Sequence, residues 1–285
     1  MTRYRRAIRD HARNEIVRQV RTLFNDRTRG EEPVRRSDNA LFAPDSMSWR
    51  VHGDVVSMMV GGIAALLLQM LHPAVLAGVW DHSGFRTDML GRLRRTARFI
   101  AITTYGDRTE AEAAITRVRA VHAHIAGTLP DGTPYRADDP ELLAWVHISE
   151  AWCFLAAWQR YGNQRLTPDH QNRYYAEFAS IGSALGAHPL PLERNATERA
   201  LHTIRPELVT NHRTREVARL VLEQRPENAL ALPVQRVVMQ AAVDLLPPWA
   251  RRMHGLSAPS VAMVPIVRAG TLQLAKTLRW AFADR

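Results

Sequence analysis

The run from Val55 to Leu71 constrains the fold more than any other stretch, because it contains no charged residue. Its length approaches that of a membrane span. A pair of glycines and Gln69 interrupt its apolar surface, and Pro73 follows shortly after it. Proline can begin a helix but cannot continue one. We therefore predict a fully buried core helix here, with membrane insertion as the alternative.

Most other predicted helices begin at short polar residues. We place N-caps at Asp88, Asp139 and Thr167, since such side chains accept hydrogen bonds from the free N–H groups of a first helical turn. Thr109 with Glu112 is interpreted as a capping box. Helices are predicted at residues 1–22, 54–71, 73–80, 89–105, 109–127, 140–161, 167–185, 196–204, 214–223, 234–246 and 261–283.

No stretch alternates polar and apolar residues between hairpin turns, as half-buried strands would. Residues 129–139, which include an Asp-Gly turn, are predicted as a loop. The fold class that follows is all-α. A charged, turn-rich segment after the first helix suggests a division into an N-terminal helical arm and loop at 1–45 and one helical domain at 46–285.

The arm holds the densest group of basic residues in the chain. We interpret it as a solvated face, with peripheral contact to a membrane or another anionic surface as the alternative. The group comprises Arg3, Arg5, Arg6, Arg9 and Arg13.

The net charge of +10 comes almost wholly from arginine, because Lys276 is the only lysine. That bias is typical of GC-rich genomes such as those of actinobacteria. The arginines are scattered through every segment, so we predict no nucleic-acid partner. Cys153 is the only cysteine and is expected to be a buried thiol. No secretory signal opens the sequence, and we expect a cytoplasmic location with possible membrane association.

Two histidines are candidates for chemistry. His122 lies on an apolar helix face with Val118, Val121 and Ile125, whereas residue 124, two positions on, points elsewhere. His147 also lies within an apolar run. The commonest role for such a histidine is that of a core residue bonded to a backbone carbonyl.

Two spaced pairs could bind ligands. Arg92 and Thr96 lie four residues apart, so they share a helix face that suits a carboxylate or a propionate. His147 and Glu150 could begin a non-haem iron site, although we find no second pair and no matching glutamates. The sequence contains no motif for covalent haem attachment, so any haem would be bound non-covalently.

Taken together, the order and spacing of many short motifs resemble the MpaB/rubber oxygenase catalytic-domain family, which includes latex clearing protein. The likeness extends over roughly residues 47–250. Its motifs are Gly61-Gly62, Leu66-Leu67-Leu68-Gln69, Leu71-His72-Pro73, His82-Ser83, Phe85, Gly91-Arg92-Leu93, Arg95-Thr96, Tyr105-Gly106, Val121-His122, Asp131-Gly132, Pro134-Tyr135, Asp139-Pro140, Leu142-Leu143, Trp145-Val146-His147 and Arg173-Tyr174-Tyr175.

The resemblance implies a single helical domain enclosing a non-covalent haem b, in enzymes that cleave isoprenoid double bonds with dioxygen. By motif, His122 matches the iron ligand. Arg92 and Thr96 match catalytic haem-pocket residues. Arg95 also falls in the cofactor site, where latex clearing protein has a lysine able to bind the iron. Arginine stays protonated and is a very poor iron ligand, so no such closed state is expected here.

The first hypothesis is therefore a haem b-dependent oxygenase acting with dioxygen on a hydrophobic, unsaturated, isoprenoid-like small molecule. Two alternatives stay open. One is a haem- or lipid-binding helical protein without turnover, and the other is a helical non-haem iron enzyme that uses His147 and Glu150.

Overall fold

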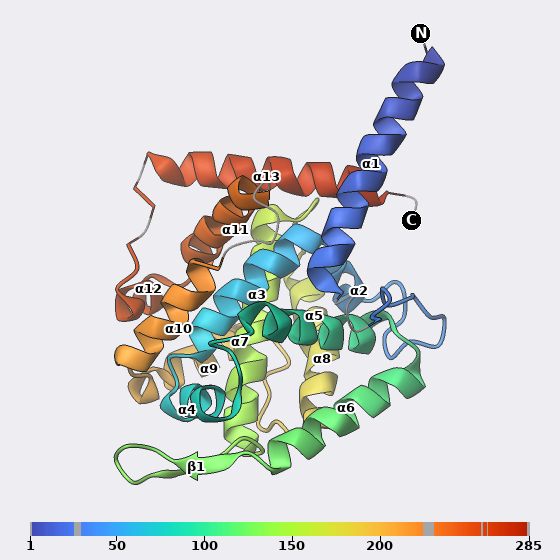
Figure 1. Ribbon diagram of the computed structural model, residues 1–285. Coiled ribbons are helices and arrows are strands. Elements are labelled where there is room, and N and C mark those ends of the chain that lie inside the picture. The colour runs from blue at the N-terminus through green and yellow to red at the C-terminus, as the bar shows by residue number, and fades with distance from the viewer. Residues whose placement is uncertain (1, 26–29, 225–230, 258, 261, 284–285) are drawn as a thin grey trace.

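A computed structural model describes residues 2–25, 30–224, 231–257, 259–260 and 262–283 (Figure 1). Helix dominates these residues, which confirms the predicted all-α class. The elements are α1 (Thr2–Phe24), α2 (Met47–His52), α3 (Val55–Gln69), α4 (Pro73–His82), α5 (Met89–Tyr105), α6 (Arg108–Ala123), β1 (Ala126–Thr128), β2 (Pro134–Arg136), α7 (Pro140–Tyr161), α8 (Pro168–Leu185), α9 (Arg194–Thr203), the 3-10 turn η2 (Arg205–Glu207), α10 (His212–Leu222), α11 (Leu232–Leu245), α12 (Pro248–His254) and α13 (Met263–Phe282).

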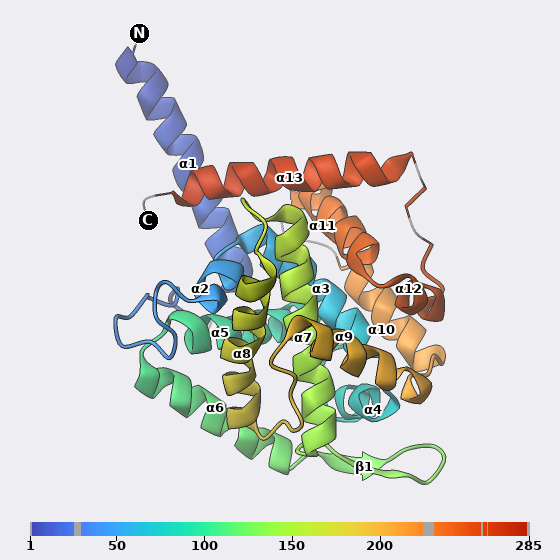
Figure 2. The same ribbon diagram turned by 180° about the vertical axis from the view of Figure 1, so that it is seen from behind.

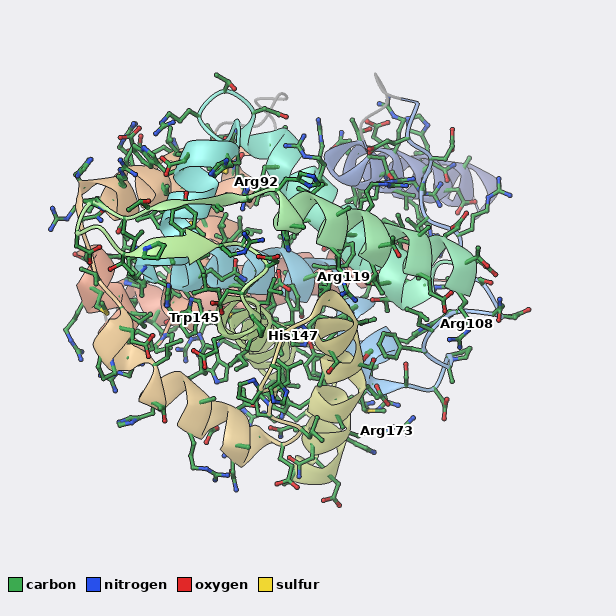
Figure 3. All side chains as sticks on the ribbon, turned by 90° about the horizontal axis from the view of Figure 1, so that it is seen from below. Arg92, Arg108, Arg119, Trp145, His147 and Arg173 are labelled. Carbon is green, nitrogen blue, oxygen red and sulfur yellow. The ribbon has the colours of Figure 1, made fainter. Side chains whose placement is uncertain are left out.

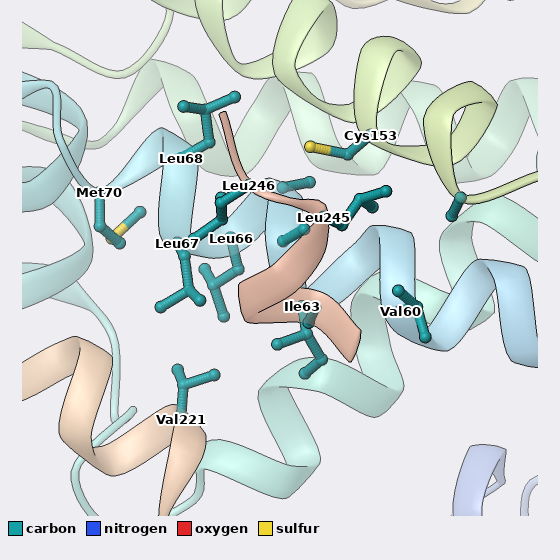
Figure 4. Close-up of a cluster of buried hydrophobic side chains, with 14 of the residues drawn as sticks. Val60, Ile63, Leu66, Leu67, Leu68, Met70, Cys153, Val221, Leu245 and Leu246 are labelled. Atoms are coloured by element: carbon teal, nitrogen blue, oxygen red, sulfur yellow. The ribbon is translucent and has the colours of Figure 1, made fainter. Parts of the chain in front are cut away.

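The uncharged run forms α3, and it lies buried along the centre of the molecule beside α7 (Figures 1 and 2). A glycine allows this close packing: a Cβ at Gly61 would lie 2.9 Å from a ring carbon of Phe154 and 3.0 Å from the Cys153 carbonyl oxygen. The predicted core helix and buried thiol are both confirmed. The apolar side chains of α3 meet Val221, Leu245 and Leu246 from later helices (Figure 4).

We also considered membrane insertion. Within the described ranges, no single helix combines the length and apolar character of a membrane span. Helices α3 and α4 meet that test only as a pair, and a bend of 103° separates them.

Other helices surround this central pair. Helices α11 and α13 pack on one side of α3, and α13 extends across one end of the molecule (Figures 1 and 2). Ion pairs to two buried aspartates fix α13 in place: Arg279 lies 2.6 Å from Asp54, the N-cap of α3, and Arg268 lies 2.8 Å from Asp244 on α11. Helices α5 and α6 pack against each other, and α6 also packs on α8.

The predicted caps at Asp88, Asp139 and Thr167 are all confirmed, each accepting a hydrogen bond from a first-turn N–H group. The predicted capping box is wrong. Asp107 caps α6 instead, through a 2.9 Å hydrogen bond from the Thr109 N–H group. Asp107 directly precedes the helix and its carboxylate reaches a first-turn N–H group, so the helix begins at Arg108, before Thr109.

The predicted loop contains β2, which forms a small antiparallel hairpin with β1 at the predicted end of the preceding helix, with Gly127 opposite Tyr135. Gly132, at a φ of +90°, occupies the predicted Asp-Gly turn. Strands this short offer no alternation to detect, which is why the sequence indicated only the turn. Helix α6 consequently ends at Ala123, before the predicted end.

Helix α1 covers the predicted arm, and its second half packs against α13 and α5. Val17 and Val20 are buried there, and Arg94 on α5 donates a hydrogen bond to the Thr22 carbonyl at 3.1 Å. The first half extends beyond the body of the molecule (Figure 1). The separate domain limits proposed from the sequence stay a prediction.

Candidate cofactor site

Helix α6 presents His122 on its inner face, in line with Ala111, Ile115 and Val118 at helical spacing. The Nδ1 atom of His122 is buried and has no hydrogen-bond partner among the described residues. Val121, which the sequence placed beside it, is instead 54% exposed. His122 is therefore the residue of α6 that carries a buried polar atom without a hydrogen-bond partner.

The neighbouring histidine behaves differently, as the sequence predicted. His124 is exposed at the helix end, and its Nδ1 atom lies 2.7 Å from the Ala120 carbonyl oxygen. It therefore bonds to its own helix and faces away from the interior.

Helix α5 brings Arg92 close to His122. Burial lowers the pKa of His122, the negative charge of Asp138 raises it, and the positive charge of Arg92 lowers it further. The net pKa is lowered, so the imidazole is neutral at neutral pH. A neutral imidazole is the form that binds metals.

The Arg92 guanidinium is half-buried, and burial and then the charge of Arg95 lower its pKa. Across the described part of the chain, the guanidinium forms no ion pair or hydrogen bond. A cation in such a place is expected to have an anionic partner. Figure 3 shows Arg92 near the N-terminal end of α5, close to α6.

The other two predicted residues of this helix lie at the surface. The Thr96 hydroxyl donates to the Arg92 carbonyl at 3.3 Å, and Arg95 pairs with Asp88 at 3.1 Å. Both side chains are exposed. The fold thus brings His122 and Arg92 together, and it leaves Thr96 and Arg95 on the outer side of α5.

The hairpin helps to frame the site. Tyr135 on β2 is buried and donates a hydrogen bond to Asp81 on α4 at 3.1 Å. A Cβ at Gly127 would lie 2.6 Å from the Tyr135 hydroxyl, so the hairpin needs a glycine there. Just past β2, Asp138 is held by Arg136 at 2.9 Å, near enough to His122 to affect its pKa.

A second polar group lies deeper, between α2, α5, α7 and α8. His52 connects two helices, with its Nδ1 atom 2.8 Å from the Thr104 hydroxyl and its Nε2 atom 3.2 Å from the Tyr174 hydroxyl. Burial lowers the pKa of His52 to about 3 and that of His147 to about 4. The sequence did not single out His52, because nothing in its surroundings distinguishes it before the helices pack.

His147 is buried on α7, close to α8, where its ring packs on Phe178 at 4.4 Å (Figure 3). It bonds to the Phe178 backbone, which is the core role expected of it. Glu150, one turn on, bonds to Gln69 of α3, and burial raises the pKa of its carboxyl to about 7. Glu150 is thus part of a buried polar cluster.

Where the structure describes the chain, no group of three or more histidine, cysteine, aspartate or glutamate side chains is arranged to hold a metal ion. His147 and Glu150 accordingly belong to no such group. The alternative of a non-haem iron enzyme has no support from the geometry.

Two surface hollows lie away from these groups. One, of about 500 Å³, is lined by His202, Arg205, Pro206, Trp249, Arg252 and Met253. The other, of about 380 Å³, opens at the start of α5 and includes Phe85, Asp88 and Arg94. Neither borders His122, so the case for a site there rests on its unpaired polar groups.

The fold therefore defines a helical protein in which the neutral imidazole of His122 lies near the guanidinium of Arg92. That guanidinium has no anionic partner among the described residues. A family model described as the catalytic domain of the ER-bound oxygenase mpaB/B′ and rubber oxygenase matches residues 49–280. The chain therefore belongs to this oxygenase family, as its motifs predicted. No curated protein and no solved structure matched it.

Proposed function

We propose that the chain is an oxidoreductase that binds a non-covalent haem b through His122 and oxidises a hydrophobic, unsaturated, isoprenoid-like small molecule with dioxygen. Family membership supports the oxygenase class. The observation that carries the haem assignment is the buried Nδ1 atom of His122, which has no partner in the described residues. An unsatisfied buried polar atom costs about 1–3 kcal/mol. Other buried histidines, including His72 and His147, also keep a ring nitrogen without a described partner. The support for haem at His122 therefore comes from that nitrogen together with the nearby Arg92 cation.

The residues present fit a haem in two respects. Burial and Arg92 keep the His122 imidazole neutral, which leaves a ring nitrogen lone pair free to bind iron. The Arg92 guanidinium has no anionic partner within the described residues, and a haem propionate is a carboxylate that such a group binds well. Together these two residues would supply a proximal ligand and a propionate partner.

When bound, the haem would supply an iron that activates dioxygen. The chain's own residues would do the rest. His122 would hold the cofactor in orientation, and Arg92 would neutralise a propionate. Arg95 is engaged by Asp88 and carries no lone pair for iron, so we propose no ligand role for it.

The test is haem titration of the purified protein, followed by its absorption spectrum. We expect His122→Ala to lose haem or to shift the Soret band strongly. His124→Ala is the matched control, because it removes an imidazole two residues away that faces solvent. A full haem content and an unchanged spectrum in His122→Ala would refute the assignment.

Turnover is tested separately, by dioxygen consumption with an unsaturated polyisoprenoid. Uptake that depends on substrate and is lost in His122→Ala supports the oxygenase. A normal haem complex without any uptake would favour the non-catalytic binding protein.

A further inference from the structure

The outward face of helix α13 differs from that of an ordinary surface helix. The inward face is ordinary: Val267, Thr271, Ala275 and Leu278 recur at helical spacing and are buried against the body. The residues of the opposite stripe are all exposed but mostly apolar, where a globular protein normally places charged residues. It consists of Pro265, Ile266, Ala269, Leu272, Gln273, Lys276 and Trp280.

The large side chains of this stripe are well exposed. Ile266 is 61% exposed and Trp280 is 41% exposed, and Met263 and Leu272 add to them. Of the large hydrophobic side chains that are exposed in the described residues, no other helix carries as many. Single exposed apolar residues are common on soluble proteins, but a stripe along one helix indicates an interaction surface.

The charges at this end of the molecule are strongly positive. Helix α1, which packs against α13, carries seven arginines against Asp10 and Glu15, and α13 contains no acidic residue. The two arginines of α13 pair with Asp54 and Asp244, although Arg268 stays exposed, and Lys276 is exposed as well. Helix α1 and Lys276 therefore hold an excess of six positive charges, more than half of the chain's net +10.

The geometry points to this α1–α13 face as a docking surface for an anionic lipid membrane, with α13 lying in the plane of the interface. An apolar stripe with an indole at one end suits the region between lipid headgroups and acyl chains. Arginines and lysine beside it suit anionic headgroups. Docking of a second copy through the same face would bring two strongly positive surfaces together, so charge favours the lipid occupant over a dimer.

The surface lies at the opposite end of the molecule from the β1–β2 hairpin beside the candidate cofactor site (Figure 1). The inference does not rest on haem binding, and its variants leave the cofactor site untouched. Far-UV circular dichroism, which depends on neither haem nor lipid, serves as the check that each variant is folded.

The experiment is flotation of the full chain with phosphatidylcholine vesicles, prepared with and without phosphatidylglycerol. We expect binding to the anionic vesicles and much weaker binding to the neutral ones. The double variant Ile266→Ser/Trp280→Ser should reduce partitioning by about tenfold or more. Lys276→Gln should reduce it by about fivefold, and Lys276→Arg should restore it.

The matched control is Leu192→Ser/Val209→Ser, which removes two side chains of similar exposure outside α1 and α13. It should bind like the wild type. The proposal is overturned if the wild type does not float, or if the Ile266→Ser/Trp280→Ser variant floats as well as the wild type. It is also overturned if sedimentation reveals a dimer that this variant abolishes while no vesicle binding occurs, or if DNA binds as tightly and is indifferent to the variant.

Discussion

Helices α3 and α7 on one hand, and α5 and α6 on the other, are packed pairs of one protein that differ in how their inner faces are satisfied. The inner face of α3 is apolar, and Gly61 lets α7 approach until Phe154 fills the space above it. The α5–α6 pair instead holds Arg92 without a described partner and His122 with an unpaired nitrogen. The α3–α7 pair also keeps buried polar atoms without a described partner, such as His147 Nε2 and Trp158 Nε1 on α7. What sets the α5–α6 pair apart is a cation without a described partner, Arg92, near such an atom, and that combination suits an anionic ligand.

This difference predicts opposite responses to mutation. Changes in the α3–α7 pair should mainly lower the free energy of unfolding. Changes at Arg92 or His122 should affect ligand binding with little loss of folding, because functional sites commonly keep polar groups that do not stabilise the fold.

The largest effect is expected at Gly61. Gly61→Val would drive side-chain atoms into the Phe154 ring and the Cys153 carbonyl, since even a Cβ there would lie within about 3 Å of both. We expect a loss of about 3 kcal/mol or more in the free energy of unfolding, the upper range for overpacking. Urea denaturation followed by circular dichroism measures it.

Its control is the adjacent residue of the same type. A Cβ at Gly62 would lie 3.7 Å from the Phe154 ring, an ordinary contact. Gly62→Ala should therefore be neutral or stabilising by up to about 1 kcal/mol, through helix propensity. Equal losses for both variants would mean that the close approach of Gly61 to Phe154 and Cys153 does not decide the effect.

A comparable effect, on binding instead of folding, is expected at Arg92. If the guanidinium pairs with a propionate in a partly buried site, Arg92→Ala should cost on the order of 3 kcal/mol of haem affinity, about two orders of magnitude. Arg92→Lys should recover only part, because the planar two-pronged contact is lost. Haem titration measures both.

Arg94 supplies the contrast on the same helix. Its guanidinium donates to the Thr22 carbonyl and so ties α5 to α1. Arg94→Ala should lower the free energy of unfolding by about 1 kcal/mol and leave haem affinity unchanged. Equal haem affinities for Arg92→Ala and Arg94→Ala would make Arg92 an ordinary surface arginine.

The sequence predicted the first region better than the second, for physical reasons. Caps such as Asp88 and Asp139 and the apolar run of α3 are local signals, readable without knowledge of packing. The approach of Arg92 to His122 depends on how two helices cross, and only the family resemblance grouped them. The role of Asp138 beside His122 depends on a hairpin too short to leave a pattern.

The third prediction concerns pH and Glu150. Folding raises the pKa of this carboxyl to about 7, because burial disfavours its charged form. Between the ordinary glutamate value and about 7, the folded state holds a proton that the unfolded state has released, so the free energy of unfolding falls as pH rises. Glu150→Gln should be more stable than the wild type above pH 7, by about 3 kcal/mol, and equal to it near pH 4.

Urea denaturation across this pH range measures the difference. His147, whose pKa is lowered to about 4, contributes a slope of the opposite sign, but it is common to both proteins and cancels in the comparison. Glu141→Gln, at an exposed position on α7, is the control. Its difference from the wild type in the free energy of unfolding should be the same at every pH. Parallel curves for the wild type and Glu150→Gln would show that Glu150 titrates normally.

The smallest effects separate two threonines of α5. Thr104 is fully buried, and its hydroxyl hydrogen-bonds to His52 at 2.8 Å. Thr104→Val keeps the shape but leaves the His52 Nδ1 atom unpaired, at a cost of about 1–3 kcal/mol in the free energy of unfolding. Thr96→Val should change it by less than about 0.5 kcal/mol, because its exposed hydroxyl bonds only to its own helix.

The haem spectrum then decides what Thr96 does. The motif match assigns this residue to the cofactor site, yet its hydroxyl faces outward on α5 and bonds to the Arg92 carbonyl. If Thr96 contacts bound haem, Thr96→Val should shift the Soret band with no change in stability, while Thr104→Val should lower stability with no shift. If Thr96→Val changes neither the Soret band nor the free energy of unfolding, Arg92 is the residue of α5 that remains in the site. The catalytic assignment of Thr96 would then be wrong.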